Sequence, residues 1–410
     1  MARVSSTTAD PAAEAAALLR RVGFAPLVLV VPTAALVTRR GLVVLIPIGV
    51  FLIVIAAAID GAQRPVAATA RAIARSPAGI AAGVAFLWCC LSLIWTPFPA
   101  QASERLLNIA ATIAMAVAGY LALPDRMRSA NLYLVPVGVV LAAAVGCAVA
   151  VFGVPVQRTP EVVAQNLDRG LTALALMVWP AAAWLNSRGR PFEALGVAAL
   201  VGLATRLGPQ GAPPIAFAAG ALAYGLTAAA GRRGVAAVAW AGAGLLALAP
   251  LIPFAMRPLA GLVLETGHSI PRTLRIWRSI VAGEPERLIT GHGFETALRG
   301  RLEGLLPVNA PNTILFELWY ELGVVGALAA AVALFAAVSA SGRNSPSVVP
   351  GMTAAFATAF AFAWLGVGTA QMWWFTALAL VVLVFVAIER GQFRTTRPKA
   401  RALRPADGLD

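Results

Sequence analysis

The feature that most constrains the fold is a series of long apolar runs separated by short basic breaks. Each run is roughly 15–25 residues long, which is about the length of helix that crosses a hydrocarbon core of ~30 Å. Hydrophobic residues make up 60% of the chain and charged residues only 12%, whereas about a quarter of the residues in soluble domains are charged. The sequence therefore predicts an all-α, polytopic helical membrane protein without a separate soluble domain.

Twelve candidate spans can be counted, and several are rich in alanine and glycine, which favours close packing of helices in lipid. They cover residues 24–38, 41–58, 78–95, 106–123, 131–153, 170–186, 192–207, 213–230, 234–254, 313–339, 350–368 and 371–389. The predicted organisation is a cytoplasmic N-terminus (1–23), a membrane domain of about nine spans (24–254), a loop (255–312), a membrane domain of about three spans (313–389) and a basic cytoplasmic tail (390–410).

The arginines of alternate breaks predict the orientation. Twelve spans place both termini on one side, and the same side receives a set of arginines from the breaks and the tail. They are Arg3, Arg20, Arg21, Arg64, Arg71, Arg75, Arg126, Arg128, Arg188, Arg190, Arg232, Arg233, Arg343 and those between Arg390 and Arg404. By the positive-inside rule this side is cytoplasmic, and the long loop then faces the periplasm. Arg39 and Arg40, between the first two spans, violate the rule.

Several classes of function are disfavoured by composition. The net charge is +14, but the distribution of the basic residues along the chain favours membrane topology and anion binding over nucleic-acid binding, so we expect no nucleic-acid partner. The basic tail suits anionic membrane lipid instead. Cys89, Cys90 and Cys147 lie in apolar runs without metal spacing and are interpreted as packing thiols. With His268 and His292 as the only histidines, a histidine-rich metal site is excluded. We expect no cleaved signal peptide.

The longest polar interruption, from about Met256 to Gly323, is the first place to look for a site. It carries seven arginines and both histidines. Within it, residues 272–281 predict a short amphipathic helix. At about 100° per residue, arginines (Arg272, Arg275, Arg278) share one arc and apolar residues (Leu274, Ile276, Trp277, Ile280, Val281) share the opposite one. The arginines suit bidentate binding of phosphate; alternatively, the helix rests its apolar face on lipid and turns its arginines to headgroups.

The sequence Gly291-His292-Gly293 follows this helix and predicts a tight turn with close approach of the backbone. His292 is either a proton carrier or a structural, exposed side chain.

Charges at predicted membrane boundaries form another set of candidates. Asp168 and Arg169 precede an apolar run, where Arg169 anchors the helix by snorkelling and Asp168 is either its partner or an N-cap. Glu317 and Glu321 lie one turn apart in the apolar segment after Asn312. They predict either a structural ion pair with a loop arginine or an acid–base or arginine-orienting role. Arg206 has the same ambiguity.

In their order along the chain, these motifs resemble the bacterial O-antigen ligase and polymerase superfamily. The resemblance lies in Arg-x-x-Arg-Ile-Trp, then Gly-x-Gly, then Asn-x-x-Leu-(x)3-Trp-x-Glu-Leu-Gly-x-x-Gly from Asn312 to Gly326. The stretches LWCCLSLIWTPFP near 87–98 and DRGLTALALMVWPA at 168–181 resemble the N-terminal half of that family.

The resemblance implies a multi-pass glycosyltransferase of the bacterial inner membrane, with its active site facing the periplasm. Such proteins take a glycan from undecaprenyl pyrophosphate with inversion, without a metal or other cofactor. They act in lipopolysaccharide or exopolysaccharide biosynthesis: ligases pass the glycan to lipid A-core, and polymerases pass it to another carrier-linked glycan.

The resemblance also implies roles for particular residues. Arg169 and either Arg272 or Arg275 would hold the pyrophosphate, and Trp277, Trp319, Gly291, Gly293 and Asn312 would be motif residues. Ligases usually carry histidine immediately before this asparagine, where the present chain has Pro311. The base that activates the acceptor hydroxyl would then be His292, Glu317 or Glu321.

Two other classes of function remain as alternatives, a transporter or flippase for lipid-linked glycan and a catalytically inactive scaffold. A transporter typically has repeat symmetry, broken helices and polar groups at the membrane midplane. The sequence has no convincing internal repeat, and its charges gather at one face, which favours the enzyme.

Overall fold

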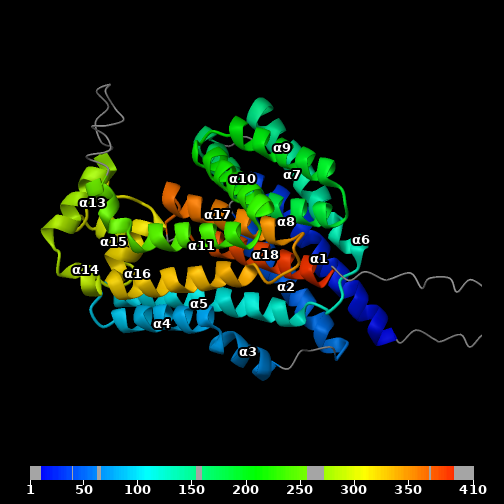
Figure 1. The fold of residues 1–410 in the computed structure, drawn as a ribbon, viewed down its shortest axis with the longest axis horizontal. Coiled ribbons are helices and arrows are strands. Elements are labelled where there is room, and N and C mark those ends of the chain that lie inside the picture. The colour runs from blue at the N-terminus through cyan, green and yellow to red at the C-terminus, as the bar shows by residue number, and fades with distance from the viewer. Residues whose placement is uncertain are drawn as a thin grey trace, which may run out of the picture.

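The computed structural model describes residues 11–38, 40–61, 66–153, 159–255, 272–368 and 371–391. Over these residues the chain is helical and has no strand (Figure 1). The helices are α1 (Pro11–Val37), α2 (Gly41–Ile59), α3 (Val66–Arg75), α4 (Pro77–Ser92), α5 (Pro99–Ala122), α6 (Ser129–Leu132), α7 (Leu134–Phe152), α8 (Pro160–Ser187), α9 (Pro191–Leu207), α10 (Ala212–Ala230), α11 (Arg232–Ala247), η1 (Ala249–Leu251), α13 (Arg272–Gly283), α14 (Arg287–Thr290), α15 (Thr296–Leu302), α16 (Ile314–Ser341), α17 (Val349–Leu365) and α18 (Met372–Arg390).

The structure supports a membrane protein with fewer clear spans than the twelve predicted. In the described parts of the chain, seven helices are long and apolar enough to cross a bilayer: α1, α2, α5, α6 with α7, α10, α16 and α18. The number rises to nine if two bent pairs count as spans, namely α3 with α4, bent by 83°, and α11 with residues 249–255, bent by 62°. The expected spans 170–186, 192–207 and 350–368 are helices too, but α8, α9 and α17 do not pass the same test.

Helix α1 extends further toward the N-terminus than the predicted first span. Helix α1 already begins at Pro11, so the segment assigned to a cytoplasmic N-terminus up to residue 23 is helical from that point. The prediction placed the start at Phe24 because Arg20 and Arg21 interrupt the apolar pattern. In the structure Arg20 lies within the helix and donates a 2.6 Å hydrogen bond to Asp60 at the end of α2.

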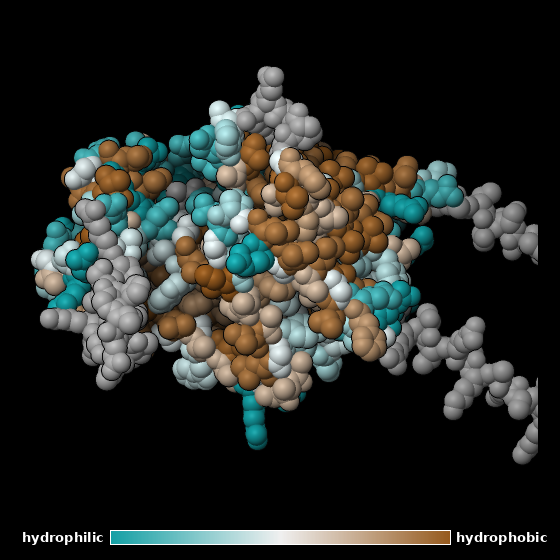
Figure 2. Space-filling model, turned by 90° about the horizontal axis from the view of Figure 1, so that it is seen from above, coloured by the Kyte–Doolittle hydropathy of each residue, from teal (hydrophilic) through white to brown (hydrophobic). Residues whose placement is uncertain are grey.

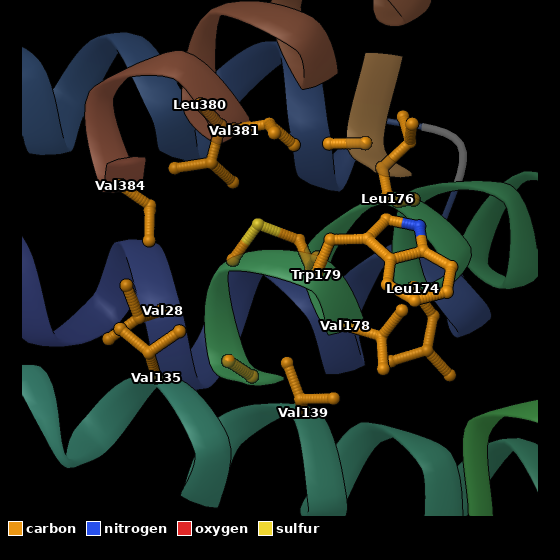
Figure 3. Close-up of a cluster of buried hydrophobic side chains, with 14 of the residues drawn as sticks. Val28, Val135, Val139, Leu174, Leu176, Val178, Trp179, Leu380, Val381 and Val384 are labelled. Atoms are coloured by element: carbon orange, nitrogen blue, oxygen red, sulfur yellow. The ribbon is translucent and has the colours of Figure 1, made fainter. Parts of the chain in front are cut away.

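Helix α8 forms the core of the bundle. Its side chains from Gly170 to Leu185 are buried, and it packs against α1, α7, α9 and α17. Trp179 donates from its indole nitrogen to Thr358 Oγ1 at 2.7 Å, and Figure 3 shows it among valines of α1, α7 and α18. A helix that is apolar on all sides belongs in such a surrounded position. Helix α8 is therefore surrounded by other helices along much of its length.

The outer surface of the bundle is strongly apolar. Figure 2 shows hydrophobic residues over the middle of the molecule, and large side chains such as Phe192 (87% exposed), Leu222 and Trp240 project outward. Contiguous apolar surface of this kind is rare on soluble monomers. The surface therefore fits a surrounding of lipid.

The bundle has two distinct ends. Helices α13, α14 and α15 lie at one end, called here the loop end, and the start of α1 and the end of α18 lie at the other, called the termini end (Figure 1). Contacts tie the basic breaks to the termini end: Arg188 donates to Gly391 O at 2.9 Å, and Met127 N donates to Arg390 O at 3.3 Å. The basic breaks at 126–128 and 188–190 thus share one end, as the alternation predicts. Which side of a membrane this end faces stays a prediction.

Candidate functional site

The centre of the loop end is a break in α16. Gly323 has φ 61° and ψ −160°, so a short first segment of the helix ends at Leu322 before the long second segment begins. A break leaves backbone carbonyls without their helical partners, and in an apolar surrounding each needs another donor. Tyr320 O accepts from His292 N at 2.9 Å, and Glu321 O accepts from Gly293 N at 2.9 Å. The predicted turn therefore caps the broken helix.

Close approach of backbones requires glycine at this junction. Gly293 has φ 96°, and a Cβ there would lie 2.6 Å from Thr96 Cα. A Cβ on Gly323 would lie 2.5 Å from Ile289 O, and Gly291, with φ 73°, packs against the backbone of Glu321. The close approach predicted for Gly291 and Gly293 is confirmed: Gly291 packs against the break in α16 and Gly293 packs against Thr96.

Helix α4 supplies the third donor to the break. Trp88 donates from its indole nitrogen to Leu322 O at 2.8 Å. Nearby, Thr96 donates to Phe294 O at 2.8 Å, and Phe294 N donates to Ser92 Oγ at 3.2 Å. The turn between α4 and α5 is thus attached to the loop at several points.

His292 is engaged at both ring nitrogens. Nδ1 lies 3.0 Å from Tyr320 O and Nε2 lies 3.0 Å from Glu284 Oε2, while the ring stacks on Tyr320 at a centroid distance of 4.0 Å. Both neighbours are acceptors, so the protonated ring, which has two N–H groups, satisfies both of them. This arrangement favours the structural interpretation of His292 over the proton carrier.

Helix α13 is amphipathic as predicted, but its apolar face packs on protein. Trp277 is buried and meets the Phe316 ring edge-on at 5.5 Å, and the other apolar residues of α13 join the same cluster with the end of α11 and the first segment of α16. The interpretation of that face as resting on lipid is therefore wrong. Arg275 is exposed, and Arg278 lies over the Phe254 ring. Arg272 begins α13, and its side chain lies outside the described residues.

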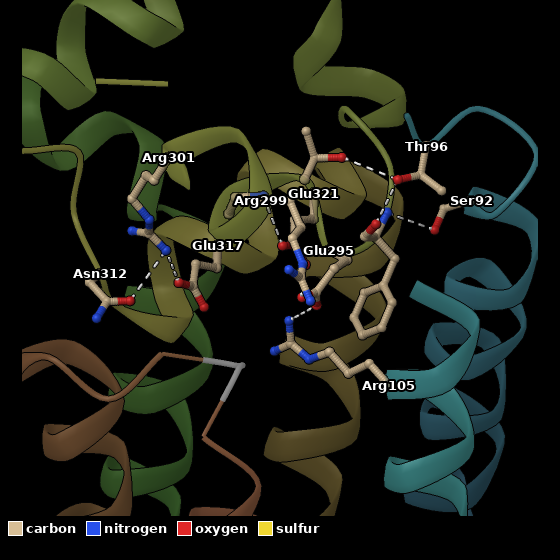
Figure 4. Close-up of polar contacts among 12 residues, drawn as sticks. Ser92, Thr96, Arg105, Glu295, Arg299, Arg301, Asn312, Glu317 and Glu321 are labelled. Carbon is tan, nitrogen blue, oxygen red and sulfur yellow. Dashed lines mark hydrogen bonds and ion pairs between the residues drawn. The ribbon is translucent and has the colours of Figure 1, made fainter. Parts of the chain in front are cut away.

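The first of two charged clusters surrounds Glu317, which is 1% exposed. Arg301 donates from Nη2 to Glu317 Oε1 at 2.5 Å and to Asn312 Oδ1 at 3.2 Å, and from Nη1 to Pro311 O at 2.8 Å (Figure 4). Gly368 closes the cluster, since a Cβ there would lie 2.6 Å from Asn312 Oδ1. The structural alternative for Glu317, an ion pair with a loop arginine, is thus observed.

The second cluster lies between α5, α15 and α16. Arg105, 7% exposed, pairs with Glu295, whose other oxygen lies 3.6 Å from Arg299 Nε. Glu321, 1% exposed, accepts a hydrogen bond from Ala297 N at 3.1 Å. Within the described residues, Arg105 Nε and Nη2 have no hydrogen-bond partner. Figure 4 shows both clusters beneath the loop.

Arg169 lies in the part of α8 that leads toward the loop end. Helices α8 and α17 are antiparallel, because Trp179 bonds to Thr358 while Ala183 lies against Gly351. Arg169 lies ten residues before Trp179, a step of about 15 Å along α8, and α17 runs seven residues from Thr358 to its end at Leu365, a step of about 10 Å. A common binding site for Arg169 and Arg272 or Arg275 stays a prediction.

Sequence reasoning missed Arg301, Arg105, Glu295 and Trp88. A charged residue at the start of the apolar run 106–123 was the available signal for Arg105, and the i,i+4 spacing of Glu295 and Arg299 was the signal for that pair. Nothing in the spacing indicates which loop arginine meets Glu317.

The geometry fixes two nearly buried cations, Arg105 and Arg301, among protein groups. Arg301 is held by a carboxylate, an amide oxygen and a carbonyl, so its guanidinium is oriented before any ligand arrives. Among the residues that the structure describes, no group of three or more His, Cys, Asp or Glu could hold a metal ion. This arrangement suits recognition or stabilisation of an anion.

Comparison of the chain with protein-family models, with curated proteins and with solved structures gave no match in any of the three.

Proposed function

We propose that this protein is a membrane glycosyltransferase of the O-antigen ligase and polymerase type, which takes a glycan from undecaprenyl pyrophosphate at the loop end. The observation that carries the proposal is the fixed, nearly buried Arg301 at the start of the broken helix α16, held by Glu317, Asn312 and the carbonyl of Pro311. The order of motifs around it supports the same function.

The chemistry follows from the leaving group. The acceptor hydroxyl attacks the anomeric carbon while the bond from that carbon to the phosphate oxygen breaks. Undecaprenyl pyrophosphate leaves with the electron pair, and negative charge grows on it. Arg301, joined by Arg169 and by an arginine of α13, stabilises that charge without reorganisation. Attack from the opposite face gives inversion.

The proton of the acceptor hydroxyl goes to a carboxylate. His292 is engaged at both nitrogens, which leaves Glu317 and Glu321 of the three candidates. Glu317 is the better choice because it lies in the cluster with Arg301, whereas Glu321 is enclosed by Ala297 and the cluster of Arg105. Glu317 therefore both orients Arg301 and accepts the proton. In this scheme a backbone carbonyl stands at position 311, where ligases place histidine.

An apolar groove offers a place for the prenyl chain of the carrier. It lies between α16, α17 and α18, has a volume of about 1020 Å³ and extends from Ile314, beside the charged cluster, to Arg343 at the termini end. Its lining includes Trp374, Leu378 and Phe385. A polyprenyl chain in this groove would bring its pyrophosphate to the start of α16.

A transporter of lipid-linked glycan is the second candidate, and the break at Gly323 favours it, since transporters build substrate sites from discontinuous helices. In those sites the freed backbone groups face the substrate or a coupling ion. Here the carbonyls of Tyr320, Glu321 and Leu322 already accept from protein donors. The enzyme is therefore the stronger proposal.

The test is complementation of a strain that lacks the gene, with surface polysaccharide separated on a gel. Glycan left on the carrier at the periplasmic face indicates a ligase, single repeat units indicate a polymerase, and carrier-linked glycan trapped at the cytoplasmic face indicates a flippase. The decisive variant is Arg301→Gln/Glu317→Gln, which removes both charges and keeps hydrogen-bonding groups, so that no buried charge is left alone.

The matched control is Arg105→Gln/Glu295→Gln, which neutralises the other buried ion pair of the loop end. We expect the first variant to lower glycan transfer by about 10²–10³-fold, as loss of a transition-state donor does, and the control to retain most activity. Full rescue by Arg301→Gln/Glu317→Gln would overturn the proposed site.

A further inference from the structure

A second arginine-lined cavity lies at the termini end, far from the site proposed above. It opens between α1, α2 and the segment that joins α5 to α6, and holds about 220 Å³, roughly seven times the ~30 Å³ that a water molecule takes in the liquid. Four arginines line it: Arg20, Arg21, Arg126 and Arg128. Such a concentration of positive charge predicts an anionic occupant.

Two of these arginines are available to a ligand. Arg20 is paired with Asp60 at 2.6 Å, but Arg21 and Arg128 are exposed, and their guanidinium groups have no hydrogen-bond or ion-pair partner among the described residues. They belong to different elements, α1 and the segment before α6, and face one cavity. Guanidinium groups from two sides suit a phosphate, which accepts several hydrogen bonds at once.

The wall that carries Arg128 is held in place by other arginines. Arg390 donates to Tyr120 O at 2.9 Å and to Leu123 O, and Arg188 donates to Ser129 Oγ at 3.2 Å. These contacts fix the backbone on both sides of Arg128. A wall positioned in advance lowers the entropy lost on binding.

Apolar groups beside the arginines indicate what carries the phosphate. Phe24 and Met127 line the inner part of the cavity, and Leu18 (63% exposed) and Val22 (48% exposed) lie on α1 next to Arg21. A ligand with a phosphate and hydrocarbon chains would cover both kinds of surface. Basic pockets between membrane helices bind lipid headgroups in this way.

We propose that this cavity binds the phosphate of an anionic phospholipid, with Arg21 and Arg128 on the headgroup and the acyl chains along the apolar face of α1. The inference is independent of the proposed glycosyltransferase activity, because it concerns the opposite end of the bundle and different residues.

The experiment measures binding of phosphatidylglycerol to the full chain, purified in detergent and freed of lipid, by native mass spectrometry. Phosphatidylcholine serves as the neutral lipid, and inorganic phosphate serves as the soluble source of the same group. The variant is Arg21→Gln/Arg128→Gln. The matched control is Arg71→Gln/Arg75→Gln, which removes the same charge from the exposed helix α3.

We expect one phosphatidylglycerol bound in preference to phosphatidylcholine, with a dissociation constant raised about tenfold or more in Arg21→Gln/Arg128→Gln and within about twofold of wild type in the control. An equal loss in both variants, or equal affinity for the two lipids, would overturn the site. If inorganic phosphate binds as tightly as phosphatidylglycerol, a phospholipid as the source is overturned. Unchanged melting temperatures of both variants show that the fold is intact.

Discussion

The two ends of the bundle use arginine in different ways. At the loop end, Arg105 and Arg301 are nearly buried and each pairs with a buried glutamate. At the termini end, Arg188 and Arg390 donate to backbone carbonyls, and Arg21 lies open in a cavity. Removing one partner of a buried ion pair destabilises the fold strongly, whereas changing an exposed, solvated charge has little effect on stability. The contrast separates enclosed, paired arginines at the loop end from arginines at the termini end that bind backbone carbonyls or lie open.

The largest expected effect comes from removing one partner of the buried ion pair between Arg301 and Glu317. Glu317→Ala leaves the Arg301 guanidinium, which is 10% exposed, without its carboxylate, and removal of one partner from a buried pair typically destabilises by about 3–5 kcal/mol. Chemical unfolding in detergent measures the change. A loss below about 1 kcal/mol would mean that water solvates this pair, since exposed pairs contribute about that much or less.

A smaller effect on stability is expected at Gly323, where α16 is broken. Gly323→Ala places a side chain in a backbone conformation open almost only to glycine and 2.5 Å from Ile289 O, so we expect a loss of about 2–4 kcal/mol. Gly304→Ala is the control, since Gly304 has φ 78° with no atom near a Cβ and should cost about 1 kcal/mol. Equal melting temperatures for the two variants would contradict the packed break.

The hydrogen bond that Trp88 of α4 donates to Leu322 O should contribute less to stability than Gly323 does. Trp88→Phe removes the N–H that satisfies Leu322 O, and a buried acceptor without a partner costs about 1–3 kcal/mol. Trp95→Phe is a matched control, because the neighbouring Trp95 has a buried indole nitrogen with no hydrogen-bond partner in the described chain. If both variants lose the same stability, ring packing rather than the hydrogen bond explains Trp88.

The smallest effect is expected at the termini end. Arg190 and Glu193 form an exposed i,i+3 pair with distances of 3.2 Å. Glu193→Gln should leave stability nearly unchanged, and any difference should vanish at high salt, because exposed ion pairs are weak and screened. The same substitution at Glu317 should be far more damaging; similar values would remove the contrast between the two ends.

Local features of the fold were predictable from the sequence. The apolar runs gave the helices, the arginine pattern placed the breaks at 126–128 and 188–190 at one end, and the spacing around Trp277 gave the amphipathic helix α13. Glu317 was singled out because a carboxylate in an apolar segment needs a partner. These conclusions depend on residues close together in the chain or on composition alone.

Features that depend on distant contacts were not predictable. Arg105 and Glu295 are 190 residues apart, and no spacing rule connects them. The break in α16 forms where the 291–293 turn and Trp88 supply donors from elsewhere, so Gly323 by itself is an ambiguous signal. The exact count of twelve spans is not confirmed, because α9 and α17 are only 17 residues long and α8 does not pass a test of length and composition.

Hydrogen–deuterium exchange on the full chain in detergent tests most directly whether the loop end is the functional end. The ligand is a short-chain prenyl pyrophosphate, which presents the group that leaves in the proposed reaction. We predict slower exchange in peptides from 272–317 on binding, and no such protection in Arg301→Gln/Glu317→Gln. Protection confined to the termini end around 123–131, or protection at the loop end that the double variant retains, would contradict the assignment.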